Sequence, residues 1–127
     1  MPARGRRPPV DRRALGARGE AAAAAHYEAR GHTVLDRNWR VREGELDLVL
    51  LAPGGRVVFC EVKTRTSDRF GAAVEAVTAT KQRRIRTLAA RWLAEHPGVG
   101  TDVRFDVAAV RIVDPAPPEV EVVQAGF

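Results

Sequence analysis

At 127 residues, the chain is long enough for one domain with a buried core and too short for two ordinary domains. Hydrophobic residues make up 45% and charged residues 29%, and no apolar run approaches the roughly 20 residues of a membrane-spanning helix. The single cysteine excludes an internal disulfide, and the basic, Pro-rich start has no apolar segment of a secretory signal behind it, so we expect a cytoplasmic protein.

The net charge of +5 is concentrated in two cationic segments. Residues 1–18 carry six arginines against one acid, and residues 80–91 carry five basic residues and no acid. The net charge is −1 over residues 19–79 and −4 over residues 92–127. Two such segments indicate a polyanionic partner such as nucleic acid, although an arginine-rich composition alone also produces solvated basic faces.

A helix is predicted over residues 11–30, behind a flexible basic arm of residues 1–10. Asp11 is a typical N-cap, the alanine run at 21–25 has high helix propensity, and Gly31 is a typical C-terminal stop. Glu20 lies on a flank with small residues, where we expect its carboxylate to approach another element closely. The predicted apolar stripe comprises Leu15, Ala22, His26 and Ala29.

Five strands and a second helix are predicted after this helix. The strands are expected at 32–41, 44–51, 56–64, 103–113 and 120–123, and the helix at 78–95. The first two connections are so short that only an antiparallel meander fits, and the third and fourth strands, joined through the helix, should be parallel neighbours. The prediction is therefore one α/β domain over residues 11–127, a mixed sheet of about five strands flanked by helices, in the order helix, three-strand meander, helix, two strands.

The expected hairpin register brings charged residues of the second and third strands together. With a three-residue loop at 53–55, residues whose numbers sum to 108 face each other, so that Asp47 opposes Glu61 and Glu45 opposes Lys63. Any other register of similar loop length would place these acids against apolar residues, so the hydrophobic pattern selects this one. The leucines at 46, 48 and 50 are expected to point together to the opposite face.

Opposed carboxylates repel each other at neutral pH unless one is protonated or a cation lies between them. Mg²⁺ usually binds one or two carboxylates and keeps waters for a substrate phosphate, so Asp47 and Glu61 are candidate ligands of Mg²⁺ or Mn²⁺. Lys63 would then hold an attacking water and stabilise developing negative charge, and Glu20 would accept a metal-bound water. The alternative is that these residues form ordinary cross-strand ion pairs on a solvated face.

Several motifs resemble the YraN-like family, a largely uncharacterised group. The motifs are Gly16-Ala-Arg-Gly-Glu20, Asn38-Trp-Arg40, Gly44-Glu-Leu-Asp47-Leu, Phe59-Cys-Glu61-Val-Lys63-Thr-Arg65, Phe70-Gly71, and Ala76-Val77 followed by Lys81-Gln82-Arg83. The resemblance runs from about Leu15 to Phe127. The family is similar in turn to archaeal Holliday-junction resolvases, and the spacing from Asp47 to Glu61-x-Lys63 is that of restriction-endonuclease-like nucleases.

The resemblance implies a restriction-endonuclease-like fold that binds nucleic acid, with Glu20, Asp47, Glu61 and Lys63 at a nuclease-type centre. RecB-type nucleases carry Gln-x-x-x-Tyr on the helix after the Glu-x-Lys strand, whereas here Gln82 is followed four residues later by Arg86. The expected nucleic-acid contacts are Arg65, Arg69, Lys81, Gln82, Arg83, Arg84 and Arg91. The three arginines of the second helix in this set avoid its predicted core stripe of Ile85, Leu88, Ala89, Trp92 and Leu93.

The expected function is that of a Mg²⁺-dependent DNA endonuclease that hydrolyses phosphodiesters in branched or single-stranded DNA, in repair or recombination. The alternative is a non-catalytic nucleic-acid-binding or adaptor domain that retains the nuclease fold and its acidic pocket. Structured RNA is a further candidate substrate, and a membrane partner is not expected. A homodimer would match the paired scissile bonds of a DNA junction.

Overall fold

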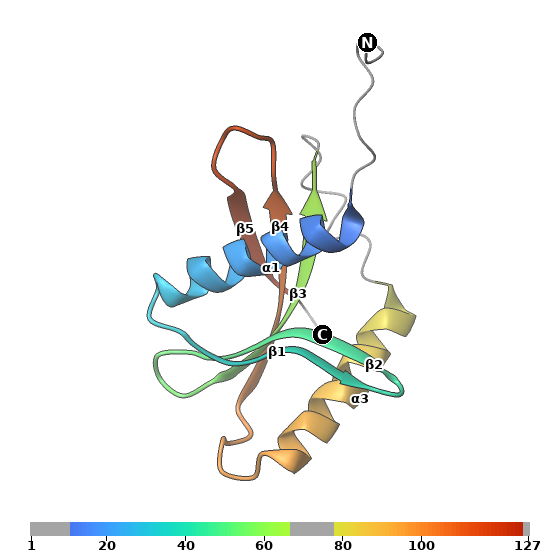
Figure 1. Cartoon of the computed structure of the whole chain (residues 1–127). Coiled ribbons are helices and arrows are strands. Elements are labelled where there is room, and N and C mark those ends of the chain that lie inside the picture. The colour runs from blue at the N-terminus through green and yellow to red at the C-terminus, as the bar shows by residue number, and fades with distance from the viewer. Residues whose placement is uncertain (1–10, 67–77, 126–127) are drawn as a thin grey trace, which may run out of the picture.

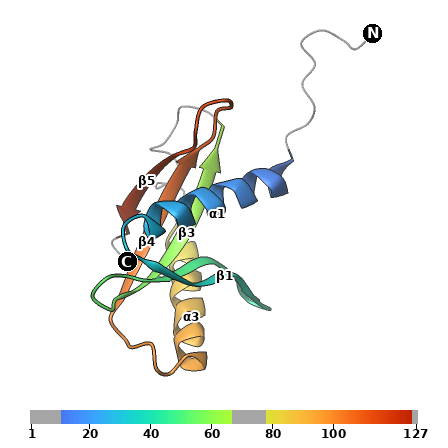
Figure 2. The same ribbon diagram turned by 60° about the vertical axis from the view of Figure 1, so that its left-hand side comes forward.

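A five-stranded mixed sheet runs through the molecule, and a helix packs against each of its faces (Figures 1 and 2). This computed structural model describes residues 11–66 and 78–125. The elements are α1 (Arg12–Glu28), β1 (Thr33–Val41), β2 (Gly44–Leu51), β3 (Val57–Arg65), α3 (Ala79–Glu95), β4 (Val103–Arg111) and β5 (Glu119–Gln124). The predicted α/β fold and element order are confirmed, with each boundary within two residues of its predicted place. Among the described helices, none is long and apolar enough to cross a membrane.

The strands lie in the sheet in chain order, β1-β2-β3-β4-β5. β1, β2 and β3 form the predicted antiparallel meander, β3 and β4 are parallel, and β5 is antiparallel to β4. The register of β2 against β3 runs from Leu48 opposite Cys60 to Leu51 opposite Val57. These pairs follow the predicted sum of 108, so the three-residue loop and the hydrophobic pattern fix the register together.

The β2–β3 ladder ends at Leu48, so Asp47 is not paired with Glu61 in the ladder as expected, and two further expectations are corrected. Glu45 does not oppose Lys63; it lies opposite Arg40 of β1 and forms an ion pair with it at 3.0 Å. Leu46 does not share a face with the next leucines along β2, because it packs in the cluster under α3. The physical reason is that the β1–β2 hairpin curls away from β3 toward α3 (Figure 1), where Gly44 lies against the Leu88 side chain.

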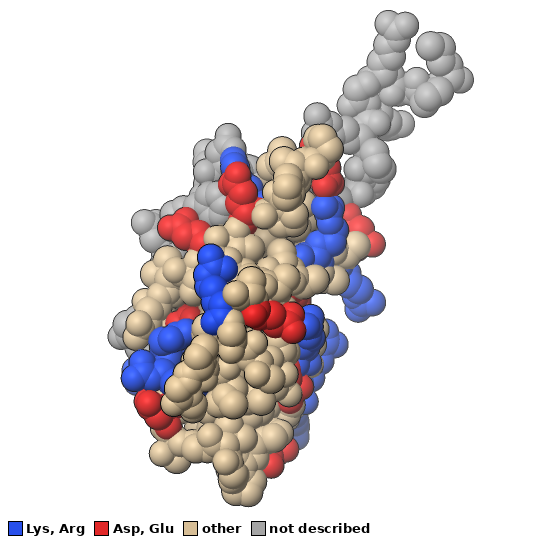
Figure 3. Space-filling view, turned by 90° about the vertical axis from the view of Figure 1, so that its left-hand side faces the viewer, with Lys and Arg blue, Asp and Glu red and all other residues tan. Residues whose placement is uncertain are grey.

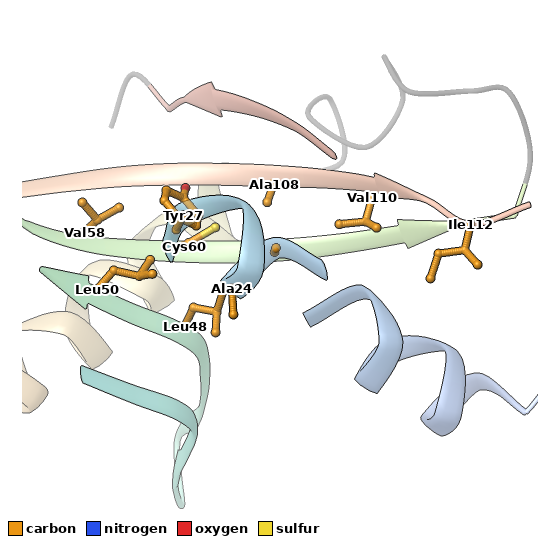
Figure 4. Packing of buried hydrophobic residues seen from close by; sticks show 10 residues of the cluster. Ala24, Tyr27, Leu48, Leu50, Val58, Cys60, Ala108, Val110 and Ile112 are labelled. Carbon is orange, nitrogen blue, oxygen red and sulfur yellow. The ribbon is translucent and has the colours of Figure 1, made fainter. Parts of the chain in front are cut away.

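Two apolar clusters hold the helices on the sheet. The cluster under α1 joins Ala24 and Tyr27 to inward-facing residues of β2, β3 and β4, and Figure 4 shows Ala24 beside Leu48 and Tyr27 beside Cys60. The cluster under α3 includes the predicted stripe residues Ile85, Leu88, Ala89 and Trp92. Both helices begin as predicted, since Asp11 caps α1 by accepting from two main-chain N–H groups, and Thr78 caps α3.

The buried face of α1 differs from the predicted stripe. Its buried residues are Gly19, Ala23, Ala24 and Tyr27. Leu15 and Ala22 pack only at the edge of the core, and Ala29 is exposed. An alanine-rich helix has little contrast in hydrophobicity around its circumference, so the face is set by where the helix backbone can come closest to the sheet.

Candidate functional site

Side chains from β2, β3, α1 and α3 converge where β2 separates from β3. One residue beyond the last β2–β3 pair, the Oδ2 atom of Asp47 accepts a hydrogen bond from the main-chain N–H of Val62 at 2.8 Å. The carboxylate therefore replaces a main-chain partner and ties the two strands together at the point where they part. Asp47 is fixed against β3 between the expected site residues Glu61 and Lys63.

Gly19 brings α1 close enough to β3 for the next residue to reach this gap. A Cβ atom on Gly19 would lie 1.9 Å from Oγ1 of Thr64, so no larger residue fits without a shift of the helix. The partly buried Glu20 follows directly, and its Oε2 atom is buried without a hydrogen-bond partner in the described structure. Burial raises the pKa of Glu20, a hydrogen bond with Asn38 opposes this, and the nearby Glu45 adds to the rise.

Asp47 lies among other acids, and their negative charges contribute to a raised pKa of its carboxyl group. Burial raises the pKa of Asp47 to about 7; the hydrogen bond from Val62 opposes the rise, and the charges of Glu61, Glu20 and Glu45 add to it. The predicted crowding of carboxylates is therefore present, with Glu45 as an additional member. A cation placed here would favour the ionised form of Asp47.

Two lysines face the carboxylate of Glu61. Its Oε1 atom lies 3.1 Å from Nζ of Lys63 and 2.6 Å from Nζ of Lys81, and its side chain is only 15% exposed. Burial and the proximity of Lys81 lower the pKa of Lys63. Lys81, expected as a nucleic-acid contact, thus lies in the site itself, carried there by the first turn of α3.

The other expected nucleic-acid contacts lie at different distances from this centre. Arg65 is at the end of β3 and lines a cavity beside Lys63, while Arg83 and Arg84 are exposed on α3 and Gln82 is half-buried. Arg91 is near the far end of α3, where it pairs with Glu43 at 2.6 Å and with Glu95 at 3.5 Å. Arg69 lies outside the described residues.

Two residues join the site that sequence reasoning did not select. Asn38 of β1 has a left-handed backbone, with φ of 50°, and makes the hydrogen bond to Glu20. Asparagine tolerates a left-handed backbone better than most residues. An asparagine inside a predicted strand, as in the motif Asn38-Trp-Arg40, is the sequence signal that could have indicated this position. Arg12 lines the cavity beside Lys63, and no spacing rule pointed to it because its place depends on how α1 crosses the sheet.

A divalent cation requires several oxygen donors that converge on one point. Within residues 11–66 and 78–125, no three side chains from His, Cys, Asp and Glu lie close enough together to hold a metal ion as they stand. Glu20, Asp47 and Glu61 are therefore not a ready-made three-carboxylate cage. Asp47 and Glu61 still fit the mode in which Mg²⁺ takes two carboxylates and completes its octahedron with water. Lys63 and Lys81 supply the positive charge for Glu61 in their present arrangement.

The opposite side of the molecule shows no comparable concentration of charge. In Figure 3, which views the side that faces left in Figure 1, acidic and basic side chains are interspersed. The pairs Arg56–Asp102 and Arg111–Glu119 lie at strand ends away from the gap between β2 and β3. The gap thus combines four acids and two lysines from four different elements.

Comparison with known proteins gives a family whose members cover nearly the whole chain. The family model described as "Uncharacterised protein family UPF0102" matches residues 19–110. A UPF0102 protein of Frankia alni is 56% identical over 90% of this chain and 94% of its own length. One from Mycolicibacterium vanbaalenii is 55% identical over 84% of this chain and 87% of its own length. One from Rhodococcus opacus is 48% identical over 90% of this chain and 96% of its own length.

A solved structure also matches at a low level. It is SfsA of Pyrococcus furiosus in complex with Ca²⁺, with 16% sequence identity and a TM-score of 0.32, over 92% of this chain and 64% of that one. Similarity of this degree says nothing about chemistry.

Proposed function

The chain belongs to the uncharacterised protein family UPF0102, and from the chemistry of its site we propose that it is a nucleic-acid-binding protein that hydrolyses phosphodiester bonds in DNA as a Mg²⁺- or Mn²⁺-dependent endonuclease. The observation that carries this proposal is the half-buried group at the gap between β2 and β3, where Asp47 and Glu61 lie beside Lys63. The resemblance of the motifs to resolvases and other restriction-endonuclease-like nucleases, together with the cationic first turns of α3, favours branched or single-stranded DNA as the substrate.

Each residue has a role that its surroundings support. Asp47 and Glu61 would hold the divalent ion, which when bound polarises the phosphate and supplies a water of lowered pKa. Asp47 would have to lose its proton to do so, since burial raises the pKa of its carboxyl to about 7 in the metal-free protein. Nζ of Lys63 holds the attacking water and stabilises the negative charge that develops on the phosphate. Glu20, with a buried unpartnered oxygen, accepts a hydrogen bond from a water in the site.

A second function is favoured by one specific observation. The carboxylate of Glu61 is already compensated by Lys63 and Lys81, an arrangement that is stable without a metal ion. A domain that keeps the fold and binds nucleic acid without cutting it, as an adaptor, would need no more than this. The two functions differ in whether the ion binds and whether the phosphodiester is cleaved.

The deciding experiment is an activity panel with the full chain. Branched, flapped, single-stranded and duplex DNA and a structured RNA are incubated with Mg²⁺ or Mn²⁺, using wild type, Asp47→Asn, and Glu121→Gln as a matched control on the exposed side of β5. We expect cleavage of at least one branched or single-stranded DNA by wild type and the control, and none by Asp47→Asn, which still binds. If every substrate stays intact with both ions while binding persists, the adaptor function replaces the endonuclease.

A further inference from the structure

A cavity of about 580 Å³ lies beside the candidate site, between the first turns of α1 and the end of β3. The residues that give it its chemistry are Arg12 and Gly16 of α1 and Lys63, Thr64, Arg65 and Thr66 at the end of β3. They come from segments that are about 50 residues apart in the sequence. No sequence motif therefore predicted this cavity, although Arg65 was expected to contact nucleic acid.

The lining of the cavity is cationic and rich in hydrogen-bond donors. Among residues 11–66 and 78–125, three basic side chains and two hydroxyl groups line it, and no acidic side chain does. Over the described ranges, no ion pair is found for Arg12 or Arg65, and the one hydrogen bond found for the Arg65 guanidinium goes to the main-chain oxygen of Thr64. An arginine without an acidic partner is available to an anion from solution, and its fork of donors matches phosphate oxygens.

The volume of the cavity favours a nucleotide unit over a single small anion. It is within the range of about 300–1,000 Å³ typical of sites for whole organic ligands, so a nucleotide unit would fit. Gly16 leaves its α1 side open, since a Cβ atom there would meet nothing within 4 Å. Lys63 lines both this cavity and the carboxylate centre, so a ligand at one is continuous with the other.

We propose that this cavity is a backbone subsite, in which Arg12 and Arg65 bind the phosphate next to the one that a divalent ion at Asp47 and Glu61 would hold. The inference rests on the proposed nucleic-acid function and deepens it by giving the strand a path past α1. The ligand class is the phosphodiester backbone of nucleic acid, and the hydroxyls of Thr64 and Thr66 donate to its oxygens. Such contacts position the strand and carry no sequence information.

The test compares two double variants with equal loss of charge. Arg12→Ala/Arg65→Ala removes the cavity's arginines, and Arg30→Ala/Arg42→Ala removes exposed arginines from the turn after α1 and the turn between β1 and β2. Binding of a fluorescent single-stranded oligonucleotide is measured by anisotropy in EDTA over a series of salt concentrations, so that no cleavage interferes. Circular dichroism and thermal melting verify that both variants are folded.

We expect the dissociation constant of the cavity variant to rise about ten-fold at low salt, and its log–log salt slope to fall by about 1.4, since each lost phosphate contact on a single strand removes about 0.7. The control should keep the wild-type slope. Equal effects in the two variants would overturn the subsite and leave nucleic-acid binding intact, whereas the absence of any binding by wild type would overturn the proposed function itself. A calorimetric titration with inorganic phosphate provides the other arm, because tight binding lost in the cavity variant would mean a free-anion site instead.

Discussion

The carboxylate of Asp47 is buried among other acids, and this sets how the residue responds to pH. Its pKa in the folded chain is about 7, whereas an unperturbed aspartate has a pKa near 4. A carboxyl group whose pKa is raised on folding stabilises the fold below its unfolded pKa and loses that contribution as the pH rises through the folded value. Above its unfolded pKa, the buried carboxylate of Asp47 therefore destabilises the native state of the metal-free protein.

Asp47→Asn should therefore stabilise the metal-free protein by an amount that grows between pH 4 and pH 7 and then levels off. The amide oxygen can still accept the hydrogen bond from Val62, while the charge is gone. Thermal melting of both proteins in EDTA at several pH values measures the difference, at about 1.4 kcal/mol for each unit of pKa shift. A difference that does not change with pH would contradict the raised pKa.

Lys81 competes with any metal ion for the oxygen of Glu61, because its ammonium lies 2.6 Å from Oε1. Lys81→Met removes that competitor and one unit of positive charge from the site. We expect the affinity for Mn²⁺, measured by calorimetry, to increase several-fold. Arg83→Met, which removes an exposed charge two residues further along α3, is the matched control and should change the affinity little. Weaker Mn²⁺ binding in Lys81→Met would show that the lysine positions Glu61 for the ion and does not compete with it.

Among the elements, α1 delivers Glu20 only because it touches β3 at a glycine. A Cβ on Gly19 would lie 1.9 Å from Oγ1 and 2.9 Å from Cβ of Thr64, so Gly19→Ala forces the helix away from the strand. Overpacking of this kind costs roughly 1–3 kcal/mol. Gly16→Ala is the matched control on the same helix, because its Cβ meets nothing within 4 Å and alanine improves helix propensity by about 1 kcal/mol.

We expect the melting temperature to fall in Gly19→Ala and to stay level or rise in Gly16→Ala. Because displacement of α1 also moves Glu20, Gly19→Ala should in addition weaken metal binding under conditions where it is still folded. Equal melting temperatures of the two variants would contradict the close packing of α1 on β3. Calorimetric unfolding of both proteins measures the outcome directly.

The local elements were predictable because each rests on nearby signals: the cap at Asp11, turn residues between strands, and an apolar stripe on α3. The register of β2 and β3 followed from loop length and is confirmed as far as Leu48. Asp47 lies beyond the last pair, but close enough to Glu61 for the two charges to interact. What failed depends on tertiary geometry. The curl of the β1–β2 hairpin moved Glu45 to Arg40 and Leu46 under α3, and the crossing of α1 placed Arg12 beside Lys63.

At the scale of the whole molecule, the basic residues of one segment differ in their surroundings according to their distance from the gap between β2 and β3. The cationic segment 80–91 lies on one helix, yet its members differ: Lys81 is in the site, Arg83 and Arg84 are exposed beside it, and Arg91 is paired with acids near the far end. Net charge over the segment therefore overstates its capacity to bind phosphate. Each phosphate that a cation neutralises releases counterions, and a paired arginine must first give up its acidic partner to do so.

Arg84→Ala and Arg91→Ala remove the same charge from the same helix and should differ in effect. Arg84 is exposed near the β1–β2 turn, where its side chain lies against Gly44, so its loss should weaken duplex DNA binding and lower the salt slope by about 0.9. Arg91 already forms ion pairs with Glu43 and Glu95, so its loss should lower the salt slope by less than half of the change expected for Arg84→Ala. Anisotropy titrations at several salt concentrations measure both slopes. Equal decreases of the salt slope in the two variants would mean that DNA contacts α3 along its full length. The DNA-binding surface would then include the far end of the helix and would not be centred on the gap between β2 and β3.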